Sequence, residues 1–114
     1  MTDELQGMKL IITIVDRDKG EKAEEILSKC GVYYQLIMLG EGTAEQEILH
    51  LLGLSSLEKD VVLSFVEEDN VEEALNQLQG KLELNKQGKG IACVVDLDCI
   101  GGSKALQILL GREC

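Results

Sequence analysis

The feature that most constrains the fold of this 114-residue chain is an internal repeat. Residues 15–27 align without a gap on residues 66–78. The matched pairs are Val15 with Val66, Asp18 with Asp69, Glu21 with Glu72, Ala23 with Ala74 and Leu27 with Leu78. Each copy has the order strand, acidic turn, helix and strand, so the sequence predicts two βαβ units in tandem.

Four stretches rich in Ile, Val and Leu have the composition of buried strands. They are Lys9–Val15, Val32–Leu39, Val61–Val66 and Ile91–Leu97. Residues Leu54–Lys59 are expected to form a loop before the third strand. Apolar residues recur every three or four positions over Glu21–Lys29 and Val71–Leu82, which predicts two amphipathic helices.

Two shorter helices are also expected. The sequence from Thr43 to Gln46 is that of a capping box, in which the side chain at each end can bond the backbone at the other, so a helix is predicted over Ala44–Leu52. Gly53 would end it. Ser103–Leu110 is expected to form a short helix near the end of the chain.

These elements predict one α+β domain over residues 1–114, with a ferredoxin-like βαββαβ sandwich fold. The first and third strands are the most uniformly apolar, as the two central strands of that sheet should be. The two long helices would cover one face of the sheet. The other face is also apolar, so we expect further copies of the chain to bury it.

The charge balance narrows the class of partner. Eleven basic and 21 acidic residues give a net charge of −10, which disfavours nucleic acids and anionic membrane surfaces as partners. No apolar run reaches the roughly 18 residues of a spanning helix. The acidic start, Met1–Glu4, does not resemble a signal peptide. We therefore expect a cytoplasmic protein with no nucleic-acid partner and no membrane insertion.

Residue types that carry catalysis or bind metals are sparse. The cysteines Cys30, Cys93, Cys99 and Cys114 form no C-x-x-C pair, and no histidine flanks them at zinc spacing. The one histidine, His50, has no nucleophile or orienting partner suggested beside it. We therefore expect neither catalytic residues nor a metal site. An enzyme or metal-handling protein on a ferredoxin-like fold is the alternative, and a structural assembly domain without a ligand is a third interpretation.

Two glycine turns remain as candidate ligand contacts. Gly40-Glu41-Gly42 follows the second strand, and Gly88-Lys89-Gly90 precedes the fourth. Glycines let the backbone approach a ligand closely, and the charge of Lys89 suits a phosphate group. In a ferredoxin-like topology, the two turns could meet across a subunit boundary.

The element order and the glycine turns resemble the nitrogen-regulatory PII family, specifically its divergent PII-like members. Residues 88–94, Gly-Lys-Gly-Ile-Ala-Cys-Val, align on that family's phosphate-loop segment. The chain departs from the family at Ile91, where a lysine is typical, and over Cys99–Ser103, where basic residues are usual. The helix predicted at Ala44–Leu52 replaces the family's long loop with its modifiable tyrosine, so uridylylation is not expected.

The resemblance implies a homotrimer that signals through protein partners, with small-ligand sites in the clefts between subunits. The family binds adenine nucleotides, and many members bind 2-oxoglutarate with magnesium. We therefore predict a non-catalytic regulator, as in nitrogen regulation, with ATP or ADP as the candidate ligand. The predicted ligand-binding residues are Gly40, Gly42, Lys59, Gly88, Lys89 and Gly90.

Overall fold

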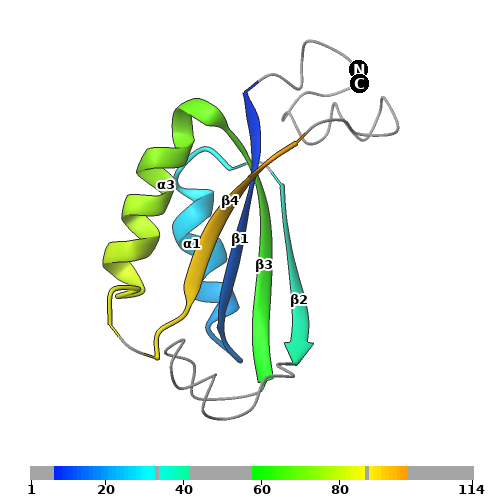
Figure 1. The fold of residues 1–114 in the computed structure, drawn as a ribbon, viewed down its shortest axis with the longest axis vertical. Coiled ribbons are helices and arrows are strands. Elements are labelled where there is room, and N and C mark those ends of the chain that lie inside the picture. The colour runs from blue at the N-terminus through cyan, green and yellow to red at the C-terminus, as the bar shows by residue number, and fades with distance from the viewer. Residues whose placement is uncertain (1–6, 33, 42–57, 87, 98–114) are drawn as a thin grey trace.

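The computed structural model describes residues 7–32, 34–41, 58–86 and 88–97. They form four strands and two helices in the predicted βαββαβ order (Figure 1). The elements are β1 (Met8–Asp16), α1 (Gly20–Ser28), β2 (Tyr34–Glu41), β3 (Glu58–Glu67), α3 (Glu68–Lys81) and β4 (Ile91–Asp96). The helices predicted at Ala44–Leu52 and Ser103–Leu110 lie outside the described residues.

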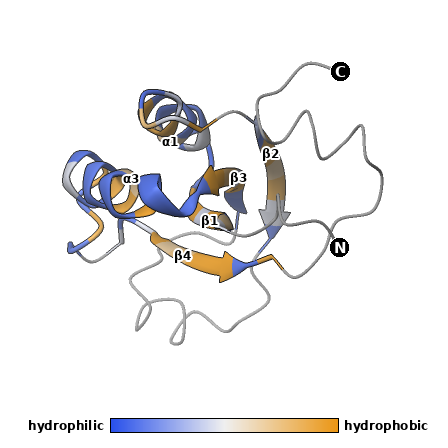
Figure 2. Cartoon of the chain, turned by 90° about the horizontal axis from the view of Figure 1, so that it is seen from above, coloured by the Kyte–Doolittle hydropathy of each residue, from blue (hydrophilic) through white to orange (hydrophobic). Residues whose placement is uncertain are grey.

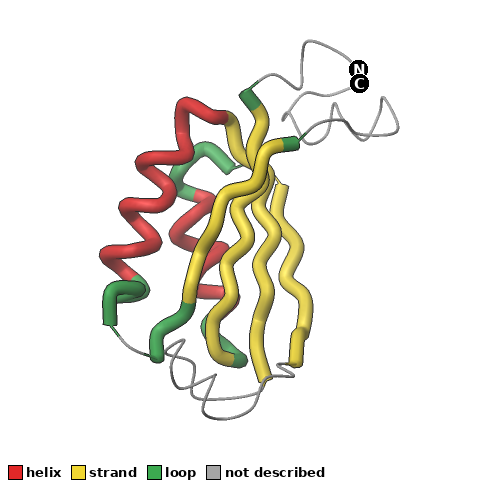
Figure 3. The backbone as a smooth tube through the Cα atoms, in the orientation of Figure 1, coloured by secondary structure: helices red, strands yellow, loops and turns green. Residues whose placement is uncertain are grey.

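The strands form one antiparallel sheet in the order β2-β3-β1-β4. The first and third strands are therefore central, as their composition predicts. Both helices lie on one face of the sheet (Figure 3). This arrangement confirms the predicted α+β fold of the ferredoxin-like type.

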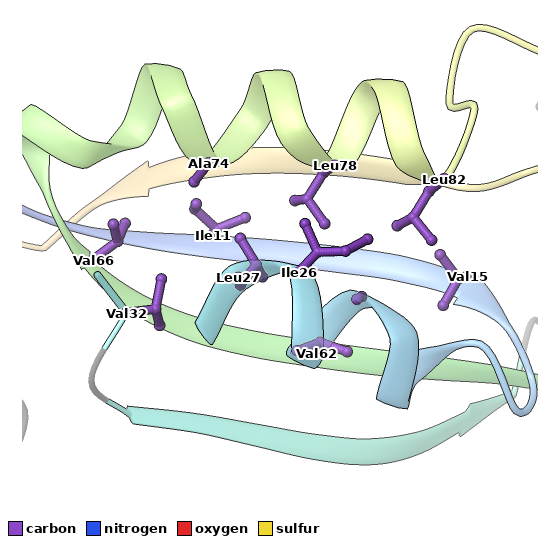
Figure 4. Close-up of a cluster of buried hydrophobic side chains, with 11 residues drawn as sticks. Ile11, Val15, Ile26, Leu27, Val32, Val62, Val66, Ala74, Leu78 and Leu82 are labelled. Carbon is purple, nitrogen blue, oxygen red and sulfur yellow. The ribbon is translucent and has the colours of Figure 1, made fainter. Parts of the chain in front are cut away.

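The core lies between this helix-facing side of the sheet and the two helices. Apolar side chains of β1 and β3 meet those of α1 and α3 there (Figure 4). The repeat pairs Ala23 with Ala74 and Leu27 with Leu78 have no exposed surface. The two copies of the repeat thus supply equivalent parts of one core.

The third strand begins earlier than predicted. Glu58, Lys59 and Asp60 belong to β3, although the polar composition at Leu54–Lys59 predicts a loop up to Lys59. Lys59 pairs with Asp16 in the sheet register, and Asp60 pairs with Val15. Their charged groups bond to neighbouring elements, and these bonds make a polar strand end stable.

The face of the sheet away from the helices is apolar across all four strands. The register places twelve side chains on this open face: Leu10, Ile12, Ile14, Tyr34, Leu36, Met38, Val61, Leu63, Phe65, Ile91, Cys93 and Val95. Leu36, Met38 and Val95 are more than 40% exposed. Figure 2 shows both helices on the other side of the sheet and the hydrophobic colouring of β4.

Candidate functional site

Most of the predicted ligand-binding residues lie at one end of the molecule. β1 and β2 finish there, β3 and β4 begin there, and the start of α1 and the end of α3 lie at the same end (the lower end in Figure 1). Gly40, Lys59 and the turn Gly88–Gly90 belong to this end. Gly42 lies outside the described residues.

A cleft of about 250 Å³ opens at this end, between the start of α1, the end of α3 and the turn before β4. Gly88 and Lys89 line it. The other lining residues are Asp16, Lys19, Lys22, Lys81, Leu82 and Glu83. Most of the side chains that line the cleft are therefore charged.

The start of α1 is fixed by a carboxylate from another element. Asp60 of β3 accepts hydrogen bonds through Oδ2 from the backbone N–H groups of Asp18 and Gly20, at 2.9 and 3.0 Å. A Cβ atom on Gly20 would lie 2.9 Å from the Asp60 side chain, so only glycine lets the helix start come this close. The bonds fix the first turn of α1, which carries Lys22, beside the cleft.

The turn before β4 is held against β1. Gly90 has φ +120°, and a Cβ atom there would lie 2.5 Å from the carbonyl oxygen of Ile14. Gly88 also has a positive φ, of +85°. The two glycines thus allow a close approach of the backbone and present the exposed Lys89 at the mouth of the cleft.

Lys59 is placed differently from its predicted role. Its side chain is buried, and its Nζ lies 2.6 Å from Oδ1 of Asp16. The lysine therefore neutralises a carboxylate beside the cleft, and its ammonium group already has a partner.

Gly40 is not brought into the lysine-lined cleft. It pairs with Lys59 in the sheet, and its carbonyl oxygen accepts a hydrogen bond of 2.9 Å from Nη2 of Arg17. It lines a second cavity, of about 340 Å³, with Arg17, Leu39, Glu41 and Glu58. Gly90 lines a third cavity, of about 300 Å³, beside Leu75 and Ile91. Of the predicted site residues, Gly40, Gly88, Lys89 and Gly90 therefore line three different cavities of one chain.

The sequence interpretation missed three lysines of the cleft. Lys19 and Lys22 are three residues apart, which is the spacing of neighbours on a helix face. Lys81 lies in the last turn of α3, where a lysine also suits the helix dipole. The spacing on α1 was a usable signal, but only the packing of the two helices brings Lys81 beside it.

Metal-binding side chains are not clustered in the described part of the chain. Among them, no group of three or more His, Cys, Asp or Glu side chains is placed to hold a metal ion. Burial raises the pKa of the Cys30 thiol, and the nearby Glu73 carboxylate raises it further. The neutral thiol that results is a poor nucleophile and a poor metal ligand. No helix in the described part of the chain is long and apolar enough to cross a bilayer.

No protein-family model and no curated protein matches the sequence, but solved structures match the fold. CPII from Thiomonas intermedia K12, bound to ADP, AMP and acetate, has a TM-score of 0.62 at 19% identity, covering 87% of this chain and 92% of that chain. The apo form of CPII, a nitrogen regulatory PII-like protein, has a TM-score of 0.59 at 20% identity, covering 79% and 88%. A PII-like signaling protein from Thermus thermophilus has a TM-score of 0.57 at 16% identity, covering 76% and 82%.

These likenesses agree with the resemblance carried by the glycine turns and the element order. The identities are low, so what the proteins share is the arrangement of the sheet and helices. The chain has the fold of the PII-like nitrogen regulatory proteins.

Proposed function

We propose that this chain is a divergent PII-like regulator that senses an adenine nucleotide, ATP or ADP, and is not an enzyme. The observation that carries the proposal is the turn Gly88–Gly90, which packs against β1 and presents Lys89 at the mouth of a polar cleft. The fold is shared with a CPII structure that contains ADP and AMP. A regulator of this kind would act in the cytoplasm by binding or releasing a partner protein.

Assembly into a homotrimer is part of the proposal. The open face is apolar over all four strands, and such a face is unfavourable in contact with water. Gly40 and Lys89 line different cavities of one subunit. A ligand at a subunit boundary would contact the Gly40 turn of one subunit and the Lys89 turn of its neighbour.

Replacing Lys89 tests nucleotide binding. The Lys89→Ala variant should bind ATP and ADP about ten- to a hundredfold more weakly, because a charge-assisted hydrogen bond contributes roughly 1.5–3 kcal/mol. Its stability without ligand should barely change, since the side chain is exposed. Calorimetric titration of both proteins with ATP, ADP and AMP measures the affinities.

Lys29→Ala is the matched control. This exposed lysine follows α1 and pairs with Glu25 at 3.9 Å, so its loss removes the same charge without touching the cleft. Its nucleotide affinity should equal that of the parent protein. The proposal is wrong if the parent protein gives neither heat nor a thermal shift with any of the three nucleotides.

A further inference from the structure

The basic residues in the described part of the chain fall into two groups, those with a carboxylate partner and those that line the cleft. Nine of the 11 basic residues lie in that part; Lys104 and Arg112 do not. Five of the nine form ion pairs: Lys9 with Asp96, Arg17 with Asp60, Lys29 with Glu25, Lys59 with Asp16, and Lys86 with Glu83. The remaining four are Lys19, Lys22, Lys81 and Lys89, and all four line the same cleft.

The two carboxylates in the cleft wall are already neutralised. Asp16 is bonded to the buried Lys59 at 2.6 Å, and Glu83 lies 3.4 Å from Lys86. The lining of the cleft therefore holds four ammonium groups against two carboxylates, each already paired with a lysine outside the lining, in a chain with a net charge of −10. Like charges that line one cleft repel one another, and an anion between them offsets that repulsion.

We propose that this cleft binds a polyphosphate group, held by Lys19, Lys22, Lys81 and Lys89. Ammonium groups bind phosphate oxygens as point charges, and several of them match a chain of phosphates better than a single carboxylate. The cleft is small and mainly polar, so it suits a short phosphate chain and offers little apolar surface to a base. Three of the four lysines come from α1, its preceding turn and α3, so this site extends beyond the glycine turn. The proposed polyphosphate binding does not depend on recognition of an adenine base.

The probes are inorganic tripolyphosphate, orthophosphate and ATP, titrated into the full chain. We expect tripolyphosphate to bind well and orthophosphate much more weakly. Lys22→Ala and Lys81→Ala should each weaken tripolyphosphate binding about tenfold, and the double variant about a hundredfold. Lys29→Ala, seven residues from Lys22 and ion-paired outside the cleft, is the matched control and should bind like the parent.

Salt gives a second readout. Binding through several lysines should weaken steeply between low and physiological ionic strength, because the cleft is open to solvent. Competition between ATP and tripolyphosphate shows which kind of compound carries the polyphosphate group. Tighter binding of ATP indicates a nucleoside polyphosphate. Equal binding indicates a phosphate chain alone. Both results support the site.

Two results would overturn it. The first is a parent protein that binds neither tripolyphosphate nor ATP. The second is tripolyphosphate binding that Lys22→Ala and Lys81→Ala leave unchanged. If Lys89→Ala then weakens ADP binding as predicted above, the proposed nucleotide function stands while this site is rejected. Conversely, tripolyphosphate binding that depends on Lys22, together with no preference for any adenine nucleotide, would keep this site and reject the proposed function.

Discussion

Asp60 of β3 holds the start of α1 in place, and this part of α1 borders the cleft. The residue is 5% exposed, and its carboxylate accepts two backbone N–H groups at the start of α1 while Nε of Arg17 lies 3.5 Å from its other oxygen. Asp18 is the acidic residue that most closely precedes this helix in the sequence, two positions before Gly20. The N–H of Asp18 is instead a donor to Asp60, and its φ is +79°.

Removing Asp60 should therefore be costly. Asp60→Ala leaves two backbone donors without their acceptor and removes one carboxylate beside Arg17, and we expect a loss of about 2–3 kcal/mol in the free energy of unfolding. Urea denaturation followed by circular dichroism measures it.

Asp69→Ala is the control, because this exposed residue lies in the first turn of α3 and its carboxylate acts mainly on the helix dipole. Its cost should be about 0.3–1 kcal/mol. Equal losses in the two variants would contradict the structural role given to Asp60.

At the scale of elements, the repeat made most of the fold predictable. Ala23, Leu27, Ala74 and Leu78 recur at helical spacing, so the buried faces of both helices follow from local pattern alone. The repeat does not predict the polar contacts. In the repeat, the position equivalent to Asp60 is occupied by Lys9. Lys9 forms an ion pair with Asp96 and does not cap a helix.

The residues of the cleft could be predicted only in part, because they come from elements that are far apart in the sequence. The glycines around Lys89 are a local signal, whereas Lys22 and Lys81 lie far apart in sequence. They become neighbours because α1 and α3 pack side by side on the sheet (Figure 4). Neither the residue types nor their spacing within either helix predicts that Lys22 and Lys81 line the same cleft.

Replacement by alanine should change the stability of the protein in opposite directions at two glycines. Gly90→Ala places a Cβ atom against the carbonyl oxygen of Ile14 and should cost at least about 2 kcal/mol. A Cβ atom on Gly80, in α3, would meet no atom within 4 Å, so Gly80→Ala should stabilise the helix by about 0.5–1 kcal/mol. Thermal and urea unfolding of both variants measure the change in the free energy of unfolding. A Gly90→Ala variant more stable than the parent would contradict the close packing of the turn on β1.

At the scale of the whole molecule, the open face governs behaviour in solution. One subunit covers the helix-facing side of its own sheet and leaves Leu36, Met38 and Val95 more than 40% exposed on the other. Strand composition was enough to predict this second apolar face. It does not specify the proposed assembly, because assembly depends on shape complementarity between whole chains.

Light scattering at micromolar concentration should give about three times the 12.5 kDa chain mass. Cys93 provides an independent probe, since it lies on the open face and is exposed in a single subunit. In the trimer it should react with iodoacetamide much more slowly than in urea, as peptide mass spectrometry would show. A stable monomer with a freely reactive Cys93 would rule out the trimer.

The pairing of β2 with β3 has a consequence for how this protein can change over time. Glu41 and Glu58 face each other in the register, and Arg17 bonds the backbone of Gly40 and Lys59 beside them. The two ends of segment 42–57 are thus fixed by the sheet itself. Since doubling the length of a connection between fixed ends costs only about 0.6 kcal/mol in closure entropy, the pairing of Glu41 with Glu58 depends little on how many residues separate them. The sheet and the cleft can therefore stay unchanged while the length of this connection changes over time.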